Sequence, residues 1–191
     1  MLYHIRRLCL LALVLGMAAC GQLVDLVQYA GSASEAQDLN ARVASLANSS
    51  FASMPDRGSA EYVGHASVVF DQNGAEVALL GRANVTADFA NARISGQVDD
   101  VFGGTGLSDL QNYAGELRFD GQIGVRRPNS FDAVIAGELS AGAQTIAVNG
   151  PLLGNFRGTG AQALTAITTA QTLAFVNGTA APVRVKITAE Q

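Results

Sequence analysis

The sequence contains no tryptophan and few cysteines, histidines and prolines, with 2, 2 and 4 of these among its 191 residues. Both cysteines, Cys9 and Cys20, lie near the start of the chain, so the rest has no thiol for a Cys/His dyad. Beyond that region His65 is the single histidine, too few for a His-rich zinc site, and we interpret it as a structural or surface residue. We therefore expect no enzyme and no cofactor. An enzyme that uses only carboxylates for catalysis is a further alternative.

The first residues have the three parts of an export signal. Arg6 and Arg7 form a positive region, residues 8–17 form an apolar run, and Met17-Ala18-Ala19-Cys20 follows. The apolar run is shorter than the roughly 20 residues that a transmembrane helix needs. Because the last four residues resemble the lipobox of bacterial lipoproteins, we predict a signal peptide over residues 1–19. The alternative is an incidental cysteine beside a plain signal or an uncleaved anchor.

Cys20 is then the lipidated first residue of the mature chain. Its thiol would carry diacylglycerol, and acyl chains such as palmitate would hold the protein on the lipid bilayer, since stable anchoring needs more than one chain. Cleavage leaves Cys20 without a second cysteine, so it cannot form an intramolecular disulfide. Gly21 follows the cysteine, which resembles the default for sorting to the outer membrane. We expect an outer-membrane lipoprotein and leave its periplasmic or cell-surface location open.

Positive charge is scarce in the predicted mature chain. Loss of Arg6 and Arg7 reduces the 12 basic residues to 10, against 16 acidic residues, which gives a net charge of −6. The sequence has no basic stripe of the kind that binds a phosphate backbone, so we expect no nucleic-acid partner. The mature length suits one domain.

Residues 34–48 have the apolar spacing of a helix. Ser34 is a suitable N-cap, and Leu39, Val43 and Leu46 recur at helical intervals. We expect a short helix within a lipidated tether over residues 20–57. This helix is either a spacer between lipid and domain or a lid or plug packed on the domain.

Residues 58–191 change to a period of two, which is typical of half-buried strands. In one segment Leu117, Phe119, Gly121 and Ile123 alternate with polar residues. Glycine-containing turn sequences separate most of these segments. The expected strands lie near 61–70, 76–89, 92–102, 114–124, 131–139, 144–149, 152–157, 163–168, 172–177 and 182–188.

About eight to ten antiparallel strands remove their exposed edges most simply by closing into a barrel. We predict an all-β fold, a small antiparallel β-barrel of about eight strands filled by side chains. Glycines such as Gly96, Gly121 and Gly137 would face inward and relieve crowding. The structural alternative is an outer-membrane barrel, in which the apolar face would meet lipid and the charged face would line a lumen.

Three segments carry short motifs: the opening segment 54–64, with its Pro-x-x-Gly and Tyr-x-Gly, the hairpin 85–98, and segment 154–164, which begins Gly-Asn-Phe-Arg-Gly. Together they resemble the barrel domains of transferrin-binding protein B and of small lipoproteins related to it. The resemblance implies a barrel and an exported lipoprotein. The chain departs from the larger receptors in having one barrel and short loops, so the resemblance does not imply transferrin as the ligand.

The expected function is non-enzymatic binding of a protein or a small ligand, with an iron source among the options. The alternative is a structural or assembly lipoprotein that contacts another envelope protein. As ligand-facing loop residues we select Gly103 and Gly104, in a glycine-rich loop, and Arg126 and Arg127, the densest positive pair. Asp99, Asp100 and Asp109 near the glycine-rich loop are a weak candidate for calcium. We assign no metal site.

Overall fold

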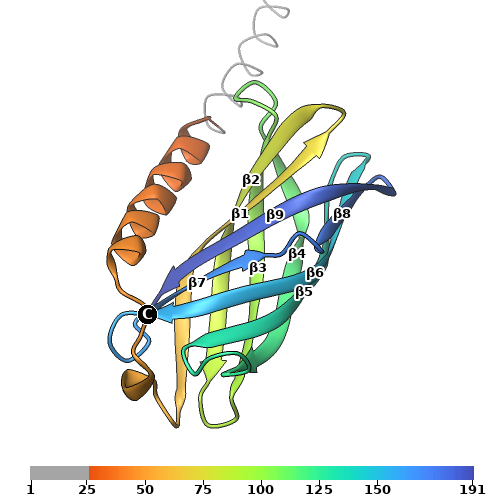
Figure 1. Ribbon diagram of the computed structural model, residues 1–191. Helices are drawn as coiled ribbons and strands as arrows, with labels where there is room; N and C mark the ends of the chain where they lie inside the picture. The colour runs from red at the N-terminus through yellow and green to blue at the C-terminus, as the bar shows by residue number, and fades with distance from the viewer. Residues whose placement is uncertain (1–25) are drawn as a thin grey trace, which may run out of the picture.

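The computed structural model describes residues 26–191, in which one helix lies against the wall of a closed β-barrel (Figure 1). The helix covers residues 26–45, and a short 3-10 turn η1 (Phe51–Ser53) follows. The strands are β1 (Ser59–Gln72), β2 (Ala75–Asp88), β3 (Arg93–Gly104), β4 (Gln111–Ile123), β5 (Ser130–Ala141), β6 (Gln144–Arg157), β7 (Ala163–Thr168), β8 (Leu173–Val176) and β9 (Thr179–Glu190).

The sheet closes because β9 returns to pair with β1. Each strand pairs antiparallel with the next through β6, and β9 pairs with β1 from Val63 opposite Glu190 to Phe70 opposite Val183. β7 and β8 both lie between β6 and β9, one after the other, so together they fill one strand position. The nine strands therefore form an eight-position antiparallel barrel, which confirms the predicted fold class.

The interruption between β7 and β8 lies opposite Pro151. Proline has no N–H to donate to a neighbouring strand. The Pro151 carbonyl instead accepts hydrogen bonds from the Thr169 amide at 3.1 Å and from the Thr172 hydroxyl at 2.8 Å. The sequence analysis predicted two strands here, 144–149 and 152–157. That division was wrong, because β6 runs unbroken and the disruption falls on its partner.

The inward side chains form one continuous apolar cluster that fills the barrel. The predicted inward set in β4 is confirmed, with Leu117 fully buried and Phe119 only 1% exposed. The ring of Phe119 lies where a Cβ on the paired Gly96 would be, 2.5 Å from its Cζ. Gly154 likewise leaves room for the ring of Phe131 on the paired strand. An apolar interior is the opposite of the polar lumen of the outer-membrane alternative.

The helix differs from its predicted bounds. It already includes residue 26, so Ser34 lies inside it and is not its N-cap, and it ends at residue 45 instead of 48. Contact between Tyr29 and Phe102, with ring centroids 5.8 Å apart, extends the packing toward the helix start. The helix lies along the outer wall, from the end of the barrel with the β3–β4 loop to the end with the chain's C-terminus (Figure 1). It packs on the domain, as one of the two alternatives expected, but it lies along the outer wall and not inside the barrel as a plug (Figure 1).

Candidate binding groove on the barrel wall

A small apolar seam attaches the helix to the barrel. Leu39 and Val43 are buried, at 4% and 0% exposure, and form a cluster with Ala163 of β7, against which Leu46 packs. Ala36, one turn before Leu39, is also buried. This spacing of three and four residues puts the apolar side chains on one face of the helix. The helix therefore covers β9 and its neighbours while its other faces stay exposed.

Polar contacts fix the second half of the helix. Thr188 of β9 is buried beneath the helix, and its hydroxyl donates a hydrogen bond to Asn40 Oδ1 at 2.6 Å. Arg42 forms an ion pair of 2.6 Å with Glu190. The Arg157 guanidinium donates to the Leu46 carbonyl at 3.0 Å, a free acceptor at the helix C-terminus. These contacts hold the helix in one position along the wall.

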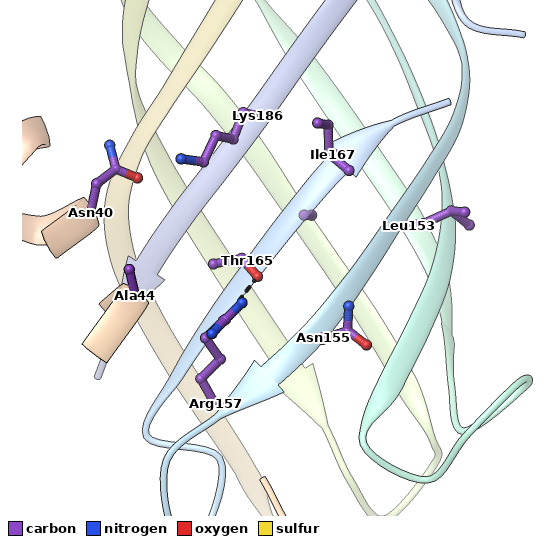
Figure 2. A pocket seen from close by; sticks show the side chains of 9 residues that line it. Asn40, Ala44, Leu153, Asn155, Arg157, Thr165, Ile167 and Lys186 are labelled. Carbon is purple, nitrogen blue, oxygen red and sulfur yellow. Dashed lines mark hydrogen bonds between the residues drawn. The ribbon is translucent and has the colours of Figure 1, made fainter. Parts of the chain in front are cut away.

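A groove of about 230 Å³ runs between this part of the helix and strands β6, β7 and β9 (Figure 2). Strand register sets the order of its side chains. Ile167 pairs with Leu153 on one side and Lys186 on the other, and Thr165 pairs with Asn155. Directly opposed side chains on one face of a sheet are close neighbours. The lining residues are Asn40, Ala44, Leu153, Asn155, Arg157, Thr165, Ala166, Ile167 and Lys186.

The groove has two cations and no acidic residue in its lining. The Arg157 side chain lies beside Thr165, with Nε 3.4 Å from the threonine hydroxyl oxygen, and Lys186 enters from β9 (Figure 2). Within residues 26–191 neither Arg157 nor Lys186 forms an ion pair with a carboxylate. In a chain with a net negative charge, the groove is thus a local region of positive charge.

The floor of the groove is apolar and continues onto an exposed surface. Ile167 is 47% exposed and Leu153 is half-buried. Further along the same side of the barrel, Val134 of β5 and Leu173 and Phe175 of β8 are also exposed and apolar. We call this surface the apolar wall, which consists of Val134, Leu153, Ile167, Leu173 and Phe175. Exposed apolar patches of this kind mark contact surfaces.

A second groove, of about 450 Å³, lies on the other side of the helix over β1 and β2. His65 faces it, together with Glu35, Asp38 and Arg42 of the helix and Arg82 of β2. Its charges are mixed and partly paired, since Arg82 contacts Asp99 at 3.2 Å and Asp100 at 2.9 Å. The first groove is therefore the one with uncompensated charge of one sign.

The predicted loop residues lie at opposite ends of the barrel. Gly103 and Gly104 are the last residues of β3, and the loop follows them. Gly103 is buried and its missing side chain lets the backbone approach the Ala78 carbonyl, so it is not a ligand-facing residue. Arg126 and Arg127 lie in the β4–β5 loop, where Arg126 pairs with Asp132 at 2.6 Å. The structure does not bring the two pairs together.

The carboxylates considered as calcium ligands already form ion pairs or hydrogen bonds within the protein. Arg82 pairs with Asp99 and Asp100, as described above. Asp109 accepts hydrogen bonds from the Thr105 amide at 3.0 Å and the Gly106 amide at 2.7 Å, and also from the Thr105 hydroxyl. These hydrogen bonds lower the pKa of Asp109, and the bond from the Thr105 hydroxyl contributes most. Within residues 26–191 no cluster of three or more potential metal ligands occurs. Asp109 is thus a loop-stabilising residue.

Sequence reasoning missed Arg157 and Lys186 because they are separated by 28 residues and belong to different strands. The one available signal was that each alternates with inward apolar residues, which predicts an outward side chain. The predicted lipidation residue, Cys20, lies outside the described residues. In the described part of the chain, no helix has the length and apolarity required to cross a membrane.

The closed barrel, filled by side chains, has a transferrin-binding-protein-B-like fold. The chain is similar to intact Ap-TbpB (N and C lobes), with a TM-score of 0.54 and 18% identity. It is also similar to two variants of TbpB from Haemophilus parasuis Hp5, with TM-scores of 0.52 and 0.51 and identities of 16% and 18%. Each match covers 75% of this chain and 28% of the other. No family description matches the sequence, and no curated protein is similar to it in sequence.

Proposed function

We propose that the chain is an outer-membrane lipoprotein that binds a protein or a small ligand on the outside of its barrel, without catalysing a reaction. The observation that carries this proposal is the groove in which Arg157 and Lys186 lie beside the exposed apolar Ile167. Because side chains fill the interior, the surface available to a partner is the outer wall and the ends. The similar structures are of transferrin-binding proteins, which supports a binding function.

The anchor is part of the proposal and rests on the lipobox-like sequence that ends at Cys20. We expect labelled palmitate to be incorporated into the wild-type protein in cells. Cys20→Ala should abolish incorporation and leave the signal uncleaved, because the processing enzyme recognises the modified cysteine. Mass spectrometry of the N-terminus checks both results. A Cys20→Ala chain that is cut near the same point and released in soluble form would contradict the anchor.

The binding surface is tested by chemical crosslinking and pull-down from envelope extracts, with and without added iron-source proteins or haem. We expect Lys186→Gln and Phe175→Ser to lower recovery of the partner, whereas Arg118→Ala, on the far strands of the barrel, leaves it unchanged. Equal recovery with all three variants would contradict binding through this wall.

The apolar wall also favours the second candidate, an assembly role in which the partner is another envelope protein. Phe175 is 41% exposed and Leu173 is 37% exposed on adjacent outward positions of β8. Aromatic and aliphatic residues of this kind form the centre of protein interfaces. One membrane protein recovered at a 1:1 ratio would support assembly, and recovery of an added iron source would support capture.

A further inference from the structure

We infer that the groove between the helix and β7 binds a single-chain anionic amphiphile, with a carboxylate head near Arg157 and Lys186 and an aliphatic tail on Ile167 and Leu153. This inference rests on the proposed binding function and names its ligand class. The arrangement places cations and apolar side chains side by side in one lining.

The head position follows from the register of the strands. Ile167 is directly opposite Lys186, and Thr165 is two residues before Ile167 on the same face. The Arg157 side chain reaches Thr165 from β6 (Figure 2). Thr165 thus lies between the two cations, and its hydroxyl is an additional hydrogen-bond donor. Hydrogen bonds from cations to a carboxylate are among the strongest in proteins.

The Arg157 guanidinium is held in place before a ligand arrives. One of its terminal nitrogens donates to the Leu46 carbonyl, and Nε lies 3.4 Å from the Thr165 hydroxyl oxygen. These two contacts leave the other terminal nitrogen free to donate. A side chain ordered in advance loses less conformational freedom on binding.

The tail position follows from what surrounds the cations. Leu153 and Ile167 form an apolar floor that a bare anion such as phosphate would leave unused. A neutral amphiphile would leave both cations unused. The groove has a volume of about 230 Å³ and is open on one side, which accommodates a head and one short chain. A longer tail would continue along the apolar wall.

The test is calorimetric titration of the mature chain, residues 20–191 with Cys20→Ser, with three probes. Octanoate has both head and tail, octanol retains only the tail, and acetate retains only the head. We expect octanoate to bind at least about tenfold more tightly than octanol, which lacks the charge-assisted hydrogen bonds, and at least about tenfold more tightly than acetate, which lacks the buried apolar tail.

Two pairs of variants locate the site. Lys186→Gln should weaken octanoate binding at least about fivefold. Its control, Arg184→Gln, changes an exposed cation two residues earlier on β9 that does not line the groove and should leave the affinity unchanged. Ile167→Ser should weaken octanoate binding but not acetate binding, whereas Val125→Ser, at an exposed apolar residue in the β4–β5 loop outside the groove and the apolar wall, should change neither. All four positions are exposed, so the variants should keep their melting temperature.

Failure of octanoate to bind at millimolar concentration, or equal binding by wild type and Lys186→Gln, overturns the inference. Crosslinking from Lys186 to an envelope protein, together with no octanoate binding, also overturns it and leaves the proposed function standing. If the palmitate and mass-spectrometry experiments find no lipid on Cys20, the proposed localisation fails while octanoate binding persists. Failure of the ligand inference and failure of the proposed localisation are therefore distinguishable.

Discussion

Phe119 and Arg118 are neighbours in β4 that point to opposite sides of the barrel wall. Phe119 is 1% exposed, pairs with the fully buried Ile135, and lies over Gly96. Arg118 is 68% exposed at its side chain and contacts Glu116 on the same strand at 2.6 Å. A substitution at Phe119 and one at Arg118 should therefore differ greatly in their effect on stability.

We expect Phe119→Ala to lower the free energy of unfolding by about 3–5 kcal/mol, because it leaves a large cavity in the core. Arg118→Ala should cost under about 1 kcal/mol, since exposed ion pairs contribute little. Denaturant unfolding of the mature chain with Cys20→Ser measures both. Similar losses in the two variants would contradict the orientation of β4.

Because Tyr62 is buried, we expect the folded protein to lose stability at alkaline pH. Its hydroxyl is buried and donates to the Ala161 carbonyl at 2.7 Å. Burial raises the pKa of Tyr62 above its ordinary value, partly offset by the hydrogen bond from Gln191. A raised folded-state pKa contributes stability that is present below the unfolded-state pKa of about 10 and lost as the pH rises through the folded value.

Tyr62→Phe should therefore cost about 1 kcal/mol at neutral pH through the lost hydrogen bond. That cost should decrease above about pH 10, because the unfolded wild-type chain then ionises first. Unfolding of both chains across this range gives the difference directly. A difference that stays constant with pH would exclude Tyr62 as its source.

At the scale of elements, the strands could be predicted because period-two alternation and hairpin turns are local signals. Asn73-Gly74 and Asn177-Gly178 both adopt the positive φ angles that two-residue hairpins require. Pro151 shows where local reasoning failed. Asn-Gly-Pro has the composition of a turn, yet β5 pairs with β6 on both sides of it, so tertiary pairing overrides the local preference.

The helix seam gives a prediction at the same scale. Leu39→Ala should weaken attachment of the helix by about 2 kcal/mol, because Leu39 is one of the few buried side chains that join it to the barrel. Hydrogen exchange of the amides in residues 36–45 should accelerate by roughly thirtyfold. Gln37→Ala, an exposed position on the same helix, should leave exchange unchanged. Fast exchange already in the wild type would contradict a fixed helix.

At the scale of the whole molecule, the barrel could be predicted and the groove could not. A closed sheet follows from the number of strands and their shared alternation. The groove depends on which side of the barrel the helix covers, and on Arg157, Ile167 and Lys186 becoming neighbours through register. Those are long-range relations that no single segment of sequence contains.

If Cys20 carries the proposed lipid, the attached helix also limits how far the protein can stand from a bilayer. The chain between Cys20 and residue 26 then reaches at most about 20 Å. Because the helix lies against the wall, it adds no free length to this tether. The barrel end with the β3–β4 loop is then held near the membrane, and the end with Arg126 and Arg127 faces away from it.

Leu107 and Val125 test this orientation, since they are 65% and 57% exposed in loops at the two opposite ends. A fluorophore on Leu107→Cys in the lipidated protein should be quenched by quencher lipids in vesicles more strongly than one on Val125→Cys. Equal quenching would mean that the barrel tumbles freely on its anchor. If the lipid is on Cys20 and this orientation holds, the groove beside the second half of the helix opens parallel to the membrane, and a ligand would reach it from the side.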